Sequence, residues 1–123
     1  MGRKKGSVSS HTKEQLDASS SVTADIKIEI FEYWKLRMNK TRPIMDAKRE
    51  NRIGWAIANY GVEACREAIE GCLASDWHMG KNPSKKFYND ISLIFQDSKH
   101  VEMFIEYNEA NTKKSARDSW VNE

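Results

Sequence analysis

Long hydrophobic runs are missing from this chain of 123 residues, which has only two cysteines and two prolines. A membrane-spanning helix needs about 20 consecutive apolar residues, and no apolar stretch of this chain approaches that length, so we expect no membrane partner. The basic N-terminus lacks the apolar segment of a secretory signal. Cys65 and Cys72 are too far apart for a disulfide within one straight helix, and we expect them to be core residues of a reduced, intracellular protein.

Motifs for catalysis, metals and phosphate-binding loops are also missing. There is no His-x-x-x-His or Cys-x-x-Cys spacing and no Gly-rich phosphate loop. Ser75, Asp76 and His78 supply the residue types of a catalytic triad, but a triad needs them to converge from separate segments. We therefore expect no enzyme, no catalytic residue, no metal and no cofactor. Two minor alternatives stay open: a zinc site from Cys65, Cys72 and His78, and a nuclease that uses Asp76 and His78.

The apolar residues that are present recur at helical spacing, and alternating runs typical of strands are lacking. We predict an all-α fold, a compact single domain (24–109) of about five helices over roughly 24–39, 46–60, 62–74, 84–96 and from 98 onward. Thr23 and Asp46 are suitable N-caps, and Gly61 suits the end of the second helix. The third helix has a mostly small inner face, which favours close approach of its neighbours, and Gly54 is another candidate for a close helix crossing.

The two ends of the chain are poor in apolar residues. Residues 1–23 are rich in Ser and Lys, so they cannot bury enough surface to offset chain entropy, and we expect a disordered basic arm. Residues 110–123 are similar apart from Trp120 and Val121, and we expect a flexible tail.

Positive charge is concentrated although the net charge is only +2. Residues 35–52 hold seven Lys or Arg against two Asp or Glu. A local basic face can attract phosphate even on a nearly neutral chain. An ordinary solvated helix surface explains the same pattern equally well. The candidate phosphate contacts of this first group are Lys35, Arg37, Lys40, Arg42, Lys48, Arg49 and Arg52.

The stretch "SDWHMGKNPSKK", residues 75–86, places basic residues beside aromatic ones. Lys81, Lys85 and Lys86 form a second group of candidate phosphate contacts, and an aromatic residue beside them suits stacking on unpaired bases. A Trp between two helices is more often a core residue, so we expect Trp77, and likewise Phe87 and Tyr88, to be buried.

The other residues of this stretch read as loop residues. Gly80 supplies a backbone conformation that other residues resist, and Asn82, Pro83 and Ser84 direct the chain into the next helix. His78 helps to shape the loop but has no assigned chemical role.

Three segments together carry a resemblance: "IFEYWKLRM", "AKRENRIGWAIANYGVEACREAIEGCLASDWHMGKN" and "FYNDISLIFQDSKHVEMFIEY". They resemble the helical C-terminal domain of phage replication proteins of the replisome-organiser type and, more distantly, that of DnaD-type primosome proteins. The most specific part is the string Trp77-His78-Met79-Gly80-x-Asn82.

The resemblance implies an accessory role in DNA replication. It implies binding of DNA, single-stranded or without sequence specificity, and recruitment of the replicative helicase or its loader. It also implies a phage- or prophage-encoded protein in the cytoplasm of a bacterial host cell. The chain departs from the family plan because it has no room for an N-terminal DNA-binding domain, so we expect a free-standing version of the helical domain. The alternative is a DNA-independent interaction module that acts as adaptor or inhibitor of a replisome component.

Overall fold

The computed structural model describes residues 21–121, with side chains through residue 113. Within this range the chain forms α2 (Ala24–Arg37), α3 (Ala47–Tyr60), α4 (Val62–Ala74), the single turn α5 (Ile91–Ile94) and α6 (Ser98–Val121). The only β pairing in the described range is an isolated bridge between Met79 and Phe87. The all-α prediction is confirmed. The predicted arm, 1–23, lies outside the described residues except for its last three positions.

Local signals set the ends of the first three helices. Thr23 has the extended backbone of an N-cap before α2, and the Asp46 carboxylate accepts a hydrogen bond from the backbone N–H of Arg49 at 2.9 Å before α3. Gly61 has φ +91°, a value that favours glycine, and it separates α3 from α4. These positions agree with the predicted helix boundaries.

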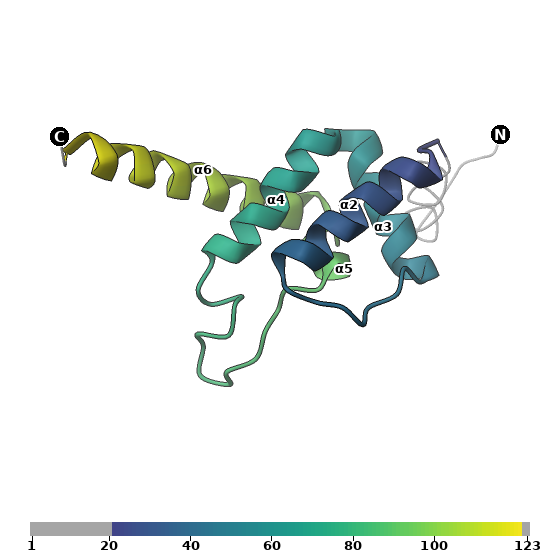
Figure 1. The fold of residues 1–123 in the computed structure, drawn as a ribbon, viewed down its shortest axis with the longest axis horizontal. Helices are drawn as coiled ribbons and strands as arrows, with labels where there is room; N and C mark the ends of the chain where they lie inside the picture. Colours follow the sequence, from purple (N-terminus) through teal and green to yellow (C-terminus); the bar gives the residue numbers. More distant parts are fainter. Residues whose placement is uncertain (1–20, 122–123) are drawn as a thin grey trace.

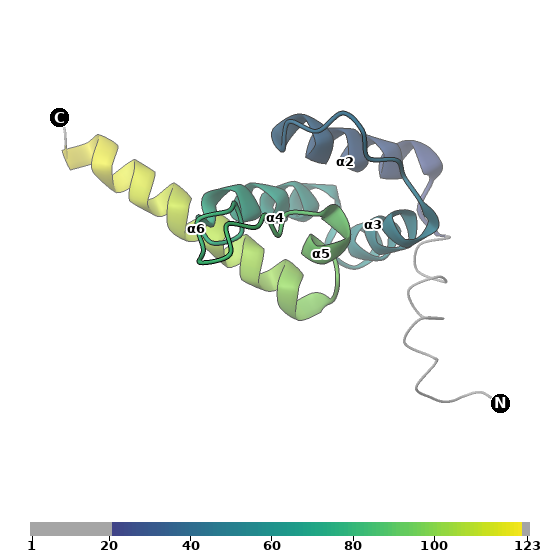
Figure 2. The same ribbon diagram turned by 90° about the horizontal axis from the view of Figure 1, so that it is seen from below.

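Helix α4 lies at the centre of the fold, between α2 and α6 (Figures 1 and 2). The buried side chains come from every helix, and the largest fully buried ones are Trp34, Phe95 and Phe104. The indole N–H of Trp34 donates to the backbone oxygen of Asn89 at 2.8 Å. This hydrogen bond joins α2 to the segment that precedes α5.

Helices α4 and α6 are in backbone contact where they cross. A Cβ atom at Gly71 would lie 1.7 Å from the carbonyl oxygen of Phe104, so only glycine fits there. The neighbouring inner positions of α4 are also small, with Ala68 and Cys72 fully buried. The expected close approach at this helix is confirmed, with Gly71 at the contact; Gly54 is buried in α3.

The predicted helix over 84–96 is wrong, because only Ile91–Ile94 is helical. Lys85 has φ +56°, and the backbone N–H of Tyr88 donates to the carbonyl oxygen of His78 at 2.8 Å instead of to a helical partner. Asp90 then caps α5 by accepting from the backbone N–H of Ser92 at 2.9 Å. A polar N-cap therefore starts the helix six or seven residues later than hydrophobic spacing suggested.

Helix α6 is longer than the pattern predicted. It continues as helix to Val121, through the segment from 110 onward that we expected to be a flexible tail. Its C-terminal part extends beyond the other helices in both views (Figures 1 and 2).

The crossing of α4 and α6 gives a direct test of the packing. Gly71→Ala should lower the free energy of unfolding by about 2 kcal/mol or more, because the new methyl group must displace the backbone of α6. Urea denaturation followed by circular dichroism measures the change. Glu67→Ala, one turn earlier on α4, is the control and should stay within about 0.5 kcal/mol of the parent. Equal stability of the Gly71 variant and the parent would contradict the crossing.

Candidate nucleic-acid interface

Three of the four arginines of the first basic group, Arg37, Arg49 and Arg52, are engaged in contacts within the fold. Arg37 donates to both carboxylate oxygens of Glu70, at 2.5 and 2.8 Å, and Tyr33 donates to the same carboxylate. Hydrogen bonding to Glu70 raises the pKa of Arg37, and hydrogen bonding to Arg37 lowers the pKa of Glu70. These contacts tie α2 to α4.

Arg49 and Arg52 hold the segment around α5. Arg49 donates to the Asp90 carboxylate at 2.7 Å and to the backbone oxygen of Ile44, also at 2.7 Å. Arg52 donates to the backbone oxygen of Ser92 at 2.7 Å. Because these guanidinium groups already donate hydrogen bonds within the domain, we assign them a structural role, and they are less available to bind a ligand.

The other members of the first group differ from one another. Lys35 pairs with Glu32 at 3.7 Å, and the ammonium group of Lys40 lies 5.5 Å from the centre of the Trp34 ring. Arg42 and Lys48 are exposed, and among the described residues neither has an acidic partner within ion-pair distance. The run of basic sequence thus yields few free charges.

Residues 75–90, which we call the Trp77 loop, form the other candidate region. Asn82 organises the tip of this loop with its side chain. Its amide nitrogen donates to the backbone oxygens of Trp77 at 2.7 Å and Lys86 at 2.8 Å. Its amide oxygen accepts from the backbone N–H of Lys86 at 3.2 Å and the hydroxyl of Ser84 at 2.9 Å. One side chain therefore closes the loop from both sides.

Glycine is required at position 80 of the Trp77 loop. Gly80 has φ +98°, and a Cβ atom there would lie 3.1 Å from the ring of Phe87. The ring of Phe87 covers the backbone at this point, on the strand-like pairing of Met79 with Phe87. The predicted special conformation of Gly80 is confirmed, and the loop has a defined shape.

The Trp77 loop is anchored to the core at its second half. The Asn89 backbone accepts from buried Trp34, and the Asn89 side chain amide contacts the sulfur atoms of Met38 at 3.6 Å and Met79 at 3.9 Å. The thiol of Cys72 donates to the backbone oxygen of Tyr88 at 3.8 Å. Burial raises the pKa of this thiol to about 12, so it stays protonated and takes part as a core group.

The expected burial of Trp77 is wrong. Trp77 is 51% exposed and stacks on Tyr88, with ring centroids 4.9 Å apart and planes inclined by 15°. Phe87, also expected in the core, is 62% exposed. The core already holds Trp34, and the ring of the loop that faces inward is His78, whose edge packs against Phe104 at 4.8 Å.

His78 has the anchoring role that the sequence suggested for Trp77. Its Nδ1 lies 2.7 Å from the hydroxyl oxygen of Ser75, and it is also close to Tyr107. Desolvation, with the nearby His100, lowers the pKa of His78, which favours the neutral imidazole. The neutral ring suits its contacts with the aromatic rings around it.

The Ser75–His78 pair has the chemistry of a nucleophile and a base, but its position favours a structural role. The two residues are three apart, and the backbone N–H of His78 also points to the Ser75 hydroxyl at 3.4 Å, as in a hydroxyl-capped turn. Ser75 follows the C-terminus of α4, where exposed carbonyl oxygens disfavour a developing oxyanion. Ser75 also lines an open cavity of about 260 Å³ together with Tyr107 and Asn111.

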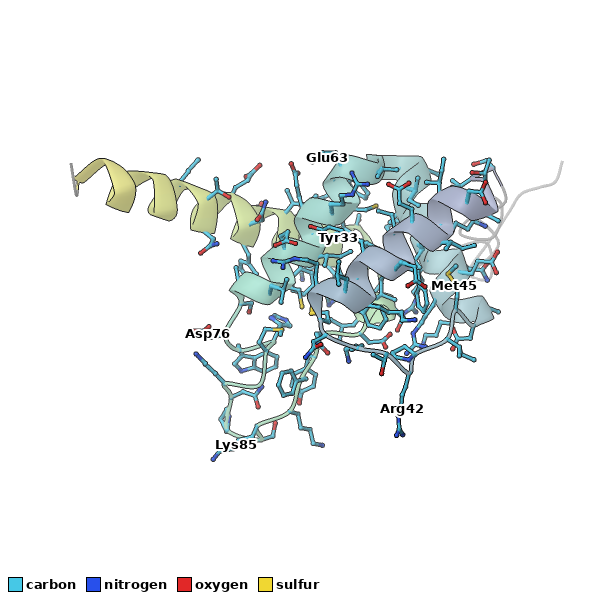
Figure 3. All side chains as sticks on the ribbon, viewed as in Figure 1. Tyr33, Arg42, Met45, Glu63, Asp76 and Lys85 are labelled. Carbon is cyan, nitrogen blue, oxygen red and sulfur yellow. The ribbon has the colours of Figure 1, made fainter. Side chains whose placement is uncertain are left out.

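The lysines of the Trp77 loop remain available on the surface. Lys81 lies 3.8 Å from Asp76, and both are largely exposed. Lys85 and Lys86 are exposed, and no described acidic side chain lies within ion-pair distance of either. Figure 3 shows Lys85 at the tip of the loop, pointing away from the helices.

The described residues lack both a cluster of metal ligands and a membrane-spanning helix. No group of three His, Cys, Asp or Glu side chains in the described residues could hold a metal ion. None of the described helices combines the length and the apolar character needed to cross a membrane. Comparison of the chain with protein-family models, curated proteins and solved structures finds no match.

The role of Asn82 can be tested by hydrogen exchange. Asn82→Ala removes all four side-chain contacts, so the backbone N–H of Lys86 should exchange much faster while the amides of α4 keep their protection. Asn59→Ala is the matched control, because the Asn59 amide bonds only the backbone oxygen of Trp55 on an exposed helix face. Unchanged exchange at Lys86 in the Asn82 variant would contradict this role.

The lowered pKa of His78 predicts a pH dependence of stability. The unfolded chain binds a proton at about pH 6.5, whereas the folded chain does so only at lower pH. Stability should therefore be full above about pH 6.5 and should fall as the pH drops through the interval between these two pKa values. Urea denaturation at several pH values measures the decrease, which His78→Gln should reduce. A variant that keeps the whole decrease would exclude His78 as its source.

Proposed function

We propose that this protein binds single-stranded DNA through the Trp77 loop, as a phage-type accessory protein of DNA replication. The observation that carries the proposal is the exposed ring of Trp77, stacked on Tyr88 in the same loop as Lys85 and Lys86, which are exposed and have no acidic partner among the described residues. Exposed apolar patches rimmed by polar residues mark interaction sites on proteins, and Trp77 and Phe87 are both exposed on this one loop.

The geometry suits an unpaired base. Tyr88 stacks on the Trp77 ring, the His78 ring lies against it at 5.1 Å and a steep angle, and Trp77 is still 51% exposed, so a base can extend the existing stack at the exposed part of the ring. Base stacking on an aromatic ring is worth about 1–3 kcal/mol and does not depend strongly on sequence. The two lysines attract the phosphates, and phosphate contacts carry no information about the base sequence. We therefore expect binding without sequence specificity.

The replication setting rests on the resemblance of the chain to phage replication proteins. It adds recruitment of the replicative helicase or its loader, in the cytoplasm of a bacterial host, to the proposed DNA contact. A second candidate is a DNA-independent interaction module. It is favoured by two exposed aliphatic side chains, Leu36 in the last turn of α2 at 78% exposure and Ile44 in the connection to α3 at 70%, which suit a protein partner.

Fluorescence anisotropy with a labelled oligothymidylate tests the DNA contact. Trp77→Ala should weaken binding by about 5- to 100-fold, since one stacked base is lost, and Trp77→Phe should restore part of the affinity. Lys85→Gln with Lys86→Gln should lower the slope of log K against log salt by about 1.4, at about 0.7 for each phosphate contact on a single strand.

Lys99→Ala, an exposed lysine in the first turn of α6, is the matched control and should leave binding unchanged. Duplex DNA of the same length should bind more weakly, because its bases are already stacked. Absence of binding at low salt, or full affinity in the folded Trp77→Ala variant, would reject the DNA contact and favour the interaction module.

A further inference from the structure

We infer that the single-strand site extends from the Trp77 loop to the connection between α2 and α3, residues 38–46. The ligand is then a strand long enough to lie across both loops. This inference rests on the proposed function and adds the path and the length of the ligand.

Both loops leave the same side of the helical body. They form its lower edge in Figure 1, and in Figure 2, which is seen from below, both run in front of the helices that they connect. In Figure 3, Arg42 and Lys85 point away from the body on this same side.

The two loops meet at one residue, which fixes their relative position. The Asn89 side chain contacts Met38 at the start of one loop and Met79 within the other. Trp34, buried beneath them, donates to the backbone of Asn89. A ligand that bridges the loops therefore binds a preformed surface, and little conformational entropy of the protein is lost on binding.

The acidic groups in this region are already neutralised or occupied. The Asp90 carboxylate accepts from Arg49 and from Ser92, and the Asp46 carboxylate accepts the backbone N–H of Arg49 as the cap of α3. Asp76 lies at the far end of the Trp77 loop, beside Lys81. Among the residues of the two loops, Arg42, Lys85 and Lys86 are exposed cations without a described acidic partner, and Lys40 lies over the Trp34 ring.

Positive side chains lie on both loops, and the stacking aromatic residues lie on the Trp77 loop alone. This arrangement fits a flexible polyanion that carries bases, which is a single-stranded nucleic acid. A stretched single strand can place phosphates at both loops and still present a base to Trp77. An acidic protein segment could meet the charges but would leave the exposed part of the Trp77 ring without a planar partner.

Strand length separates this inference from the simpler site. Two oligothymidylates, one of about 4 and one of about 16 nucleotides, correspond to the shortest and longest sites found for single-strand-binding OB folds. Arg42→Ala should leave the affinity for the short strand unchanged. It should weaken the long strand about two- to fivefold, the range of an exposed ion pair, and lower its salt slope by about 0.7.

The controls follow from the same surface. Arg42→Lys should keep most of the long-strand affinity, and Lys99→Ala should affect neither strand. Arg42 makes no ion pair in the described part of the chain, so its substitution should not disturb folding.

The outcomes are distinguishable. If neither strand binds, the proposed function itself fails. If both bind and Arg42→Ala changes neither affinity, the site is confined to the Trp77 loop and the inference is overturned. An equal loss for both strands would show that Arg42 acts on a strand too short to bridge the loops, which also overturns the inferred path. If poly-glutamate displaces the long strand as well as unlabelled oligothymidylate does, charge alone determines binding, and an acidic protein becomes the better partner.

Discussion

The contact between the Trp34 indole and the backbone of Asn89 is the constraint on which most of the structure depends. Trp34 is fully buried, and its N–H has one partner, 55 residues further along the chain. Leaving such a donor unpaired in the core costs about 1–3 kcal/mol. This cost favours conformations in which the backbone oxygen of Asn89 stays within hydrogen-bonding distance of the Trp34 indole. Around the same ring lie the side chains of Lys40 and Arg49, at 5.5 and 5.7 Å. A single aromatic side chain thus fixes the connection after α2, the start of α3 and the end of the Trp77 loop.

The Trp77 loop has order without regular secondary structure. Side-chain amides replace the hydrogen bonds that a helix would supply, and two residues, Gly80 and Lys85, take up left-handed conformations. Such conformations are costly outside glycine and persist where the surroundings hold them in place. The loop held in this conformation presents the exposed Trp77 ring in one orientation. The segment whose backbone departs most from what its residue types favour is therefore the Trp77 loop, which is also where we propose that DNA binds.

The sequence predicted those features that depend on near neighbours. Asp46 and Gly61 marked helix ends correctly because capping and positive φ are local properties. The error over 84–96 arose because Phe87, Tyr88 and Ile91 have helical spacing, while the competing contacts of Asn82 cannot be seen in periodicity. Likewise, spacing cannot decide which of Trp34 and Trp77 occupies the core. That depends on the partner of each ring, and the partner of Trp34 is remote in sequence.

The basic run over 35–52 shows why counting charges is a poor guide to a nucleic-acid surface. Arg37 and Arg49 pair with carboxylates 33 and 41 residues away, and these contacts appear only after folding. Yet Arg49 still influences the surface, because it neutralises Asp90 where an unpaired carboxylate would repel phosphate. A chain of net charge +2 can in this way present a locally positive face. Under the proposed function, phosphate attraction by so few free cations would be weak and readily screened by salt, and stacking on Trp77 would have to supply much of the binding energy.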